Sequence, residues 1–552
     1  MSNDHGESDV TPTESETTGT VGNFPHGSRE TPVTSVSSME ADRSEKARRH
    51  KADMYVAGES DSSIVPKKPA NNGSLLPAES AEGRELTEEN TEQSLLVRTQ
   101  RRNADGTPFV PRSRGLLGVR EAARKDSKLR FTSLLHHITP ELLRTSFFDL
   151  KKQAAPGVDG EMWRDYAVDF ARRIDDLHGR IHRGAYRAKP SKRTYIPKPD
   201  GRMRPLGIAS LEDKIVQQAA RTVLECIYEQ DFLGCSYGFR PKRSQHRALD
   251  ALFVGITKRK VNWIIDADIR GFFDNISHEW LMKFLEHRIA DRRMLRLLKK
   301  WLRAGVSEDG AWSPTEIGTP QGAVISPLYA NVFLHYVLDL WINEWRTRHA
   351  KGEVIFVRYA DDFVMGFREE SDARRCLAAL GQRLAKFGLE LHPEKTRLIE
   401  FGRFAEERRA KRGDGPPATF DFLGFTHISG KTRRGDFTIH RKTSRKKFQA
   451  TLAKLKEQLL RRRHDDLAKV GSWLQSVYRG WCQYYAVPGN YARLRQFRTA
   501  IQVMWLRTLR LRSQRGRRLT WLKFSKLSRR WLPTPKILHP YPNVRFARQH
   551  PR

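Results

Sequence analysis

Two apolar runs in this chain end in aspartate, and together they predict the centre of the fold. The run "VNWIIDADI" (261–269) delivers Asp266 and Asp268, and "EVIFVRYADDFVMGF" (353–367) contains Asp361 and Asp362. The first run reads as a buried strand and the second as a β-hairpin with its acids at the turn. A tight turn projects adjacent carboxylates from a rigid base, which suits the hard cation Mg²⁺. We therefore predict a two-metal site at these strand ends.

The choice of carboxylates needs a second argument, because an Asp-Asp pair in a hairpin turn is usually a solvated loop. Asp266 and Asp268 both follow the apolar strand, and strand alternation puts them on one face, so spacing alone does not choose between them. Phe273 favours Asp268, since an aromatic five residues later would stand beside a nucleotide sugar. We expect Asp268, Asp361 and Asp362 to be the catalytic carboxylates.

The formal net charge of +36 predicts a polyanionic partner. Nucleic acid is favoured over a membrane because no run approaches the roughly 18 apolar residues that a spanning helix needs. Residues 467–552 contain no Asp or Glu, so the cations there have no local acid to pair with. The four cysteines are scattered without a C-x-x-C pair, which argues against a zinc site and fits a reducing, intracellular compartment.

Further motifs accompany the acids in a fixed order, and the set resembles a known family. "YADD" follows "DIRGFF" and "GTPQGAVISPLYANVFLH" and precedes "FDFLGF", an order that resembles the reverse transcriptases. The motif sequences themselves resemble those of group II intron-encoded proteins. The resemblance covers about residues 116–545. It implies an α+β right-hand polymerase, with fingers and an antiparallel palm sheet, followed by an α-helical thumb or maturase domain.

Composition and resemblance together suggest a domain plan. Residues 1–112 are rich in Ser, Thr, Glu and Gly and lack hydrophobic periodicity, so we expect a disordered N-terminal extension. The segments expected after it are the N-terminal extension of the polymerase with the fingers (113–255), the palm (256–430, within a reverse transcriptase region of about 190–428), the thumb or maturase domain (431–512) and a basic nucleic-acid-binding tail (513–552).

Roles carried over from the family fall on individual positions. The resemblance implies metal ligands at Asp268, Ile269, Asp361 and Asp362. It implies nucleotide-binding residues at Lys198, Arg204, Phe273, Gln321 and Gly322, with Phe273 as the steric gate that excludes a ribose 2′-OH. Lys395 resembles the lysine near the pyrophosphate leaving group, a candidate general acid. The resemblance implies a primer grip at Phe422, Leu423 and Gly424.

Basic residues supply the expected contacts to nucleic acid. We expect them in the fingers, the thumb and the tail, at Arg240, Lys242, Arg243, Arg479, Arg493, Arg495, Arg515, Arg517, Arg518 and Lys523. An amphipathic helix would give the same pattern in the fingers segment, so contact by its individual residues stays open.

The function expected from this resemblance is RNA-directed DNA polymerization by a group II intron protein that also assists splicing and retrohoming. The resemblance implies these ligands: Mg²⁺, deoxynucleoside triphosphates, intron RNA, an RNA template with a DNA primer, and target DNA. It also implies a location in the bacterial cytoplasm. The chain ends without the Cys pairs of an endonuclease, which implies no DNA nicking activity of its own. The oligomeric state stays open, a dimer included. The alternatives are a splicing cofactor with a vestigial polymerase site and a domesticated or retron-like reverse transcriptase.

Overall fold

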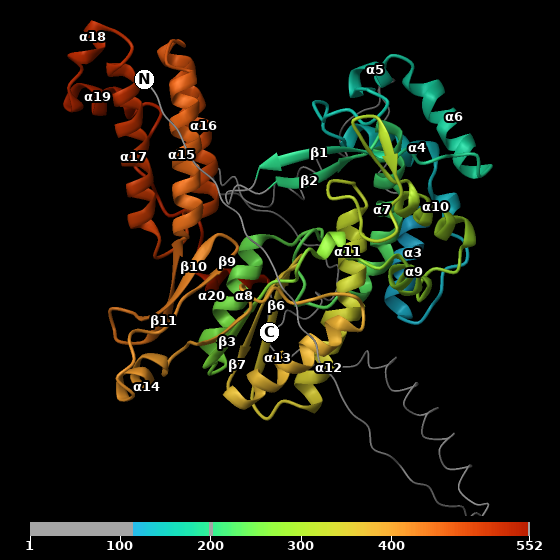
Figure 1. The fold of residues 1–552 in the computed structure, drawn as a ribbon, viewed down its shortest axis with the longest axis horizontal. Helices are drawn as coiled ribbons and strands as arrows, with labels where there is room; N and C mark the ends of the chain where they lie inside the picture. Colours follow the sequence, from blue (N-terminus) through green and yellow to red (C-terminus); the bar gives the residue numbers. More distant parts are fainter. Residues whose placement is uncertain (1–113, 198–202, 550–552) are drawn as a thin grey trace, which may run out of the picture. The chain divides into compact units, whose positions relative to one another are not determined.

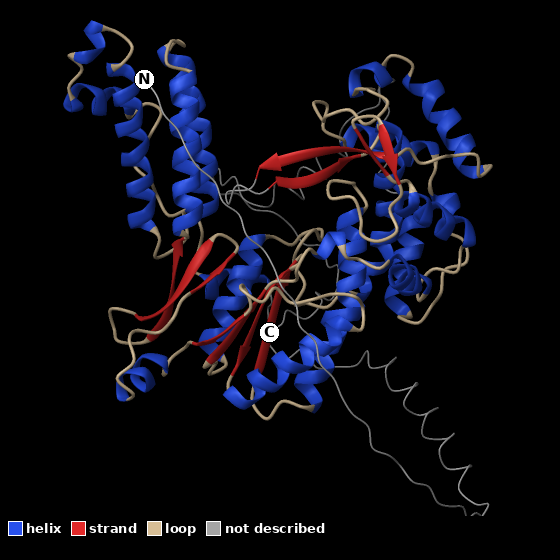
Figure 2. Cartoon of the chain, viewed as in Figure 1, coloured by secondary structure: helices blue, strands red, loops and turns tan. Residues whose placement is uncertain are grey.

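The computed structural model describes residues 114–197 and 203–549, and in these it shows the mixed α and β structure that the sequence predicts (Figures 1 and 2). The predictions for residues 1–112 and for Lys198 lie outside the described residues. Among the described helices, none is long and apolar enough to cross a membrane.

The central sheet has the strand order β6-β7-β3-β8, and every neighbouring pair is antiparallel. Its strands are β3 (Trp263–Ala267), β6 (Val354–Tyr359), β7 (Asp362–Phe367) and β8 (Arg397–Glu400). Both faces are covered, which explains why β3, β6 and β7 read as continuous apolar runs. Ile264 and Val364 pack in one core with helix α8 (Gln245–Lys258), and Ile265 and Met365 pack in another with α13 (Glu370–Ala385).

The sequence "RTYIPKPDGRMRPLGIAS" (193–210) places Pro-Asp-Gly between two runs and so predicts a strand pair around a turn. The second sheet, in the order β2-β1-β4-β5, confirms that pair as β1 and β2. Its strands are β1 (Ser191–Pro197), β2 (Met203–Ile208), β4 (Val306–Glu308) and β5 (Ala311–Ser313). The surrounding helices are α3 (Arg114–Lys125), α4 (Pro140–Asp149), α5 (Trp163–Ala167), α6 (Phe170–His182), α7 (Leu211–Asp231), α9 (His278–Glu286) and α10 (Arg292–Arg303). Apolar residues recur at helical spacing over 134–143, at Leu134, Leu135, Ile138, Leu142 and Leu143. They do not lie in one helix, because Thr139 caps a new helix that begins at Pro140.

The apolar pattern after the Gly-Pro loop of "GTPQGAVISPLYANVFLHYVLDLW" (318–341) predicts a helix, and the segment is helical but changes its winding. It comprises α11 (Ser326–Leu334), one π-turn (His335–Asp339) and α12 (Leu340–Arg348). Such π-turns frequently accompany functional sites. Asp339, the last residue of the π-turn, is fully buried and pairs with Arg358.

The third sheet joins the palm segment to the C-terminal helices. Its strands are β9 (Phe420–Phe422), β10 (Phe425–Lys431) and β11 (Phe437–Thr443), in the order β11-β10-β9. The expected palm–thumb boundary at 430/431 therefore falls inside β10. The helices that follow are α15 (Arg445–Arg461), α16 (Leu467–Tyr485), α17 (Tyr491–Arg510), α18 (Gln514–Arg517), α19 (Trp521–Ser528) and α20 (Pro542–Gln549), while α14 (Ala405–Lys411) precedes β9.

The end of the expected basic tail is folded onto another part of the chain. Helix α20 packs against α8, and Arg545 pairs with Asp250, a carboxylate that is fully buried. Arg441 from β11 contacts the other oxygen of Asp250 at 3.1 Å. Asp250 thus neutralises two cations from segments far apart in sequence, and this part of the tail has a structural role.

Candidate active site

The hairpin turn and the end of β3 bring the predicted carboxylates to one edge of the central sheet. Tyr359 pairs with Asp362 across the turn, and Ala360 has a positive φ of 58°. In the β3–β7 pairing, Ala267 lies opposite Phe363, so the next antiparallel step places Asp268 opposite Asp362. The geometry therefore brings together the acids that the two sequence runs predicted.

Electrostatic crowding supports this placement. Burial, followed by the charges of Asp361 and Asp268, raises the pKa of Asp362 to about 7. Burial also raises the pKa of Asp361, and Asp268 adds to that effect, whereas the positive charge of Arg204 opposes it. Carboxylates that disfavour one another's ionisation in this way have the charge density that a bound cation relieves.

Two basic side chains contact the acids that follow β3. The Lys395 ammonium lies 2.5 Å from Asp268, and Arg397 donates to Asp266 at 2.8 Å. The loop before Lys395 is held in place by the main chain, since the His392 N–H donates to the Asp268 carbonyl at 2.8 Å. Asp266 therefore has a partner of its own, and Lys395 stands beside Asp268.

A divalent metal ion fits the donor chemistry of this edge, because aspartate oxygens are hard ligands and three of them come from adjacent strands. The side chains do not converge on one point: among residues 114–197 and 203–549, no three His, Cys, Asp or Glu side chains are grouped closely enough to hold a metal ion. In this structure Asp268 contacts the cation Lys395, and Asp266 contacts the cation Arg397.

The elements expected to bind a nucleotide meet beside the acids. The Thr319 N–H donates to the Phe273 carbonyl, and the Gln321 amide lies 3.3 Å from the Asp274 carboxylate. Gly207 of β2 donates its N–H to the Gln321 carbonyl at 2.8 Å. Strand β2, which carries Arg204, is therefore joined to the Pro-Gln-Gly turn, and that turn to the segment of Phe273.

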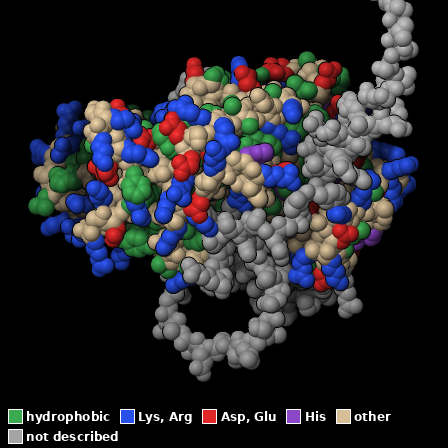
Figure 3. All heavy atoms as spheres, turned by 90° about the horizontal axis from the view of Figure 1, so that it is seen from below, with side chains coloured by type: hydrophobic (Ala, Val, Ile, Leu, Met, Phe, Trp, Pro, Cys, Tyr) green, Lys and Arg blue, Asp and Glu red, His purple; other side chains and the backbone are tan. Residues whose placement is uncertain are grey.

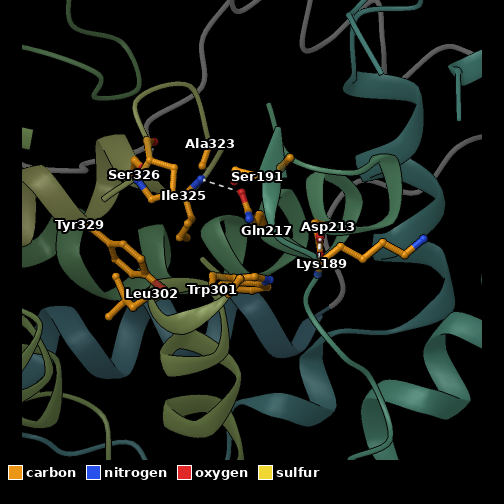
Figure 4. A pocket seen from close by; sticks show the side chains of 13 residues that line it. Lys189, Ser191, Asp213, Gln217, Trp301, Leu302, Ala323, Ile325, Ser326 and Tyr329 are labelled. Carbon is orange, nitrogen blue, oxygen red and sulfur yellow. Dashed lines mark hydrogen bonds between the residues drawn. The ribbon is translucent and has the colours of Figure 1, made fainter. Parts of the chain in front are cut away.

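Gly322 and Gln217 explain how this turn keeps its shape. Gly322 has φ of +114°, and a Cβ there would lie 3.0 Å from the Gly207 carbonyl oxygen. The buried Gln217 of α7 accepts hydrogen bonds from the N–H groups of Val324 and Ile325 at 3.0 and 3.4 Å (Figure 4). Sequence reasoning missed Gln217, because only the fold brings α7 under the turn.

A buried arginine, Arg358, supports the β6–β7 hairpin that carries Asp361 and Asp362. Arg358 of β6 is fully buried and makes a two-point contact with Asp339 at 2.7 and 2.6 Å. It also donates to Asn331 at 3.1 Å, to the Ala360 carbonyl at 2.9 Å and to the Ser236 hydroxyl at 2.8 Å. All five N–H donors of the guanidinium thus have acceptors. The signal in the sequence was a lone charge in an apolar strand, which requires a buried partner.

The segment around Gly238 completes this support. Tyr237 and Arg358 pair through the main chain, because the Tyr237 N–H donates to the Arg358 carbonyl at 2.9 Å. A Cβ at Gly238 would lie 2.2 Å from the backbone nitrogen of Ala360. Only glycine lets the two backbones approach this closely.

Gly238→Ala is therefore expected to displace the hairpin turn and to reduce catalytic turnover by about 100-fold, since a displacement near 1 Å has about that effect. Turnover would be measured by single-nucleotide primer extension. Gly381→Ala is the matched control, because a Cβ there meets nothing within 4 Å. Equal activity of the two variants would contradict the supporting role of Gly238.

The predicted primer grip lies in a tight hairpin between β9 and β10. Leu423 and Gly424 form its turn, with φ of 47° and 79°. The Tyr484 hydroxyl of α16 donates to the Leu423 carbonyl at 2.8 Å, and the Gly424 carbonyl accepts from the Ser444 N–H at 3.0 Å. The turn is thus held between the third sheet and α16, and its contact with a primer stays a prediction.

The basic residues expected to contact nucleic acid differ in exposure. Arg240 is buried, pairs with Glu229 and donates to the Leu233 and Ser236 carbonyls, which does not fit the expected phosphate contact. Arg243 likewise donates inward, to the Gly234 carbonyl at 2.7 Å. Both arginines close the loop between α7 and α8 through partners 4 to 11 residues away.

The other basic residues are better placed for a phosphate. Lys242, Arg479, Arg495, Arg517, Arg518 and Lys523 are exposed, and Arg493 is half-buried beside Gln496. The side chain of Arg515 lies outside the described residues. Lys and Arg side chains are more numerous than Asp and Glu toward the left end of the face in Figure 3.

Comparisons with known proteins agree with this geometry. Residues 196–427 match the family model described as reverse transcriptase (RNA-dependent DNA polymerase). The chain is 33% identical over 355 residues to protein YkfC of Escherichia coli (strain K12), which covers 57% of this chain and 88% of that protein. It is 37% identical over 220 residues to the group II intron-encoded protein LtrA of Lactococcus lactis, covering 38% of this chain and 36% of LtrA. It thus spans most of the first relative and about a third of the second.

Proposed function

The chain belongs to the group II intron-encoded reverse transcriptases, and from this membership we propose that it copies RNA into DNA with Mg²⁺ and binds an intron RNA to assist splicing and retrohoming. Reverse transcriptases use divalent metal ions and deoxynucleoside triphosphates. The observation that carries the proposal is the meeting of Asp268, Asp361 and Asp362 at one sheet edge, beside Arg204 and the Pro-Gln-Gly turn.

Each residue near this edge has a distinct proposed task. Asp268, Asp361 and Asp362 would hold the metal ions, and Ile269 could add only its main chain because its side chain is apolar. Bound Mg²⁺ would supply activation of the primer hydroxyl and charge neutralisation at the triphosphate. Arg204 would bind the triphosphate, and Lys395 would donate a proton from Nζ to the leaving pyrophosphate.

The test is primer extension by the purified full chain on an RNA template with a DNA primer, dNTPs and Mg²⁺. Synthesis of DNA is expected, and chelation of the metal is expected to stop it. A wild-type protein that binds the template–primer but extends no primer would show that the polymerase proposal is wrong and would favour the splicing cofactor.

Phe273 offers a sharper test of nucleotide selection. Its half-buried ring lies next to Phe272, with the ring centroids 5.3 Å apart. Phe273→Val is expected to raise ribonucleotide incorporation relative to deoxynucleotides by about 10- to 100-fold, because a pocket rejects an added hydroxyl mainly by shape. The measurement is the ratio of kcat/KM for the two nucleotides.

The neighbouring Phe272 provides the control for this measurement. Its ring is buried in the core, so Phe272→Leu is expected to lower thermal stability without changing sugar selection. If the two variants change the nucleotide ratio equally, Phe273 is not the steric gate.

A further inference from the structure

Helix α10 carries an unusual concentration of positive charge on its outer side. Its cations are Arg292, Arg293, Arg296, Lys299, Lys300 and Arg303, and the helix contains no acid. Its apolar residues, including Leu297, Leu298 and Trp301, are buried, whereas all six cations are exposed or half-buried. The charged side is therefore a surface and not part of the core.

On several other helices, some exposed cations have acidic partners four residues away. Examples are Arg348 with Glu344, Arg374 with Glu370 and Arg461 with Glu457. In the part of the chain that the structure describes, no cation of α10 forms an ion pair. Its (i, i+4) neighbours, such as Arg292 with Arg296, repel each other, which disfavours the helix on its own.

The acid nearest in sequence is already occupied. Asp291 caps α10, and its carboxylate accepts hydrogen bonds from the N–H groups of Arg293, Met294, Leu134 and Leu135. Four backbone donors leave Asp291 little capacity to neutralise side chains along the helix. Among the described residues no acid pairs with the α10 cations, so their charge must be compensated from elsewhere.

A cavity of about 140 Å³ adjoins the helix where α6 ends. Its lining includes Arg183, Arg293, Arg296 and Lys300, and none of the described residues that line it is an acid. The Lys300 ammonium donates to the Gly184 carbonyl at 3.2 Å and to the Tyr186 carbonyl, so the loop after α6 is tied to α10.

Tyr186, which lines this cavity, is held by a hydrogen bond, and positive charges gather around the cavity. The Trp301 indole donates to the buried Tyr186 hydroxyl at 3.0 Å. Burial and the positive charges of Arg296 and Arg187 lower the pKa of Lys300. An anion in the cavity would lie among three arginines and one lysine.

We propose that the α6–α10 surface, defined as Arg183 with the six cations of α10, binds the phosphate backbone of RNA. This inference rests on the proposed function, which supplies RNA as the polyanion, and the surface shares no residue with the candidate active site. Helix α10 has 12 residues and is roughly 18 Å long, so its row of cations exceeds the reach of one phosphate ion. A strand with regularly spaced phosphates matches such a row, and guanidinium forks bind phosphate at two points.

The test compares two charge-matched variants of the full chain. The first neutralises the surface with Arg183→Gln, Arg293→Gln and Arg296→Gln, and leaves Lys300 to hold its loop. The second, Arg348→Gln, Arg374→Gln and Arg461→Gln, removes three positive charges that already have acidic partners. Each protein is first saturated with a short template–primer duplex, and binding of labelled poly(A) RNA is then measured over a range of salt concentrations.

The surface variant is expected to bind poly(A) about tenfold or more weakly than wild type. Its salt dependence, as the slope of log K against log salt, is expected to be shallower by about 2, because each lost single-strand contact removes about 0.7. Extension of the short primer and the thermal midpoint should stay within error of wild type. An unchanged slope, or an equal loss in the control variant, would overturn the proposal.

The binding readout does not depend on DNA synthesis. If the wild type makes no DNA, the proposed polymerase function is contradicted. If the surface variant nevertheless binds poly(A) more weakly than the wild type, RNA binding by the α6–α10 surface is still supported. The two proposals therefore fail independently.

Discussion

Replacing Asp361 with asparagine is expected to reduce RNA-templated DNA synthesis by at least about 1,000-fold, because a carboxylate that holds a catalytic metal contributes about 4 kcal/mol or more to the transition state. Asparagine keeps the size of the side chain and its place in the hairpin turn, so the loss would come from charge. The measurement is the single-turnover rate of primer extension, with the affinity for template–primer measured in parallel.

Asp436→Asn is the control for this result, because Asp436 is exposed and lies between β10 and β11, away from the catalytic edge. It is expected to extend primers at the wild-type rate. The Asp361 variant should keep its template–primer affinity. A rate within tenfold of wild type would contradict the assignment of Asp361 as a catalytic carboxylate.

Replacing Asp339 with asparagine is expected to cost about 3–5 kcal/mol of unfolding free energy, because it leaves the Arg358 charge buried without a counter-charge. Both side chains are fully buried, so solvent offers no compensation. The same guanidinium donates to the Ala360 carbonyl next to Asp361, so turnover should fall as well. Chemical denaturation and primer extension at a temperature where the variant is folded would measure the two effects.

A double variant separates stability from positioning. Arg358→Met with Asp339→Leu is expected to recover most of the lost stability, since apolar residues of similar volume often replace a buried ion pair without loss. It should not recover turnover, because methionine cannot donate to the Ala360 carbonyl. Recovery of both stability and turnover would show that the ion pair is only structural.

A second buried pair supplies the comparison. Arg288 is buried, the Asp231 side chain is 9% exposed, and the two lie 3.2 Å apart; Arg288 also donates to the Asp126 carbonyl at 3.2 Å, outside the hairpin. Arg288→Met with Asp231→Leu is therefore expected to keep wild-type turnover once the protein is folded. If the Arg288 and Arg358 double variants lose turnover equally, removal of any buried ion pair lowers turnover, and Arg358 has no specific role in positioning the hairpin.

The sequence predicted the elements of the catalytic edge because their signals are local. An apolar run that ends in acid predicts a strand and the place of its carboxylate, and the structure confirms β3 and the β6–β7 hairpin. The Pro-Asp-Gly turn likewise predicted the β1–β2 pair. The choice of Asp268 over Asp266 rested on Phe273, and the structure adds that each acid has its own cation, Lys395 or Arg397.

The sequence by itself determined which carboxylates stand at which strand ends, because strand periodicity and turn chemistry act over a few residues. Tertiary structure alone decided which cations face water. Arg358 is buried by partners from distant segments and Arg240 by acceptors on α7 and the loop after it, whereas no described acid pairs with the cations of α10. The physical reason is that the burial of a charge depends on partners the fold brings together, and neighbouring residues in the chain do not specify them.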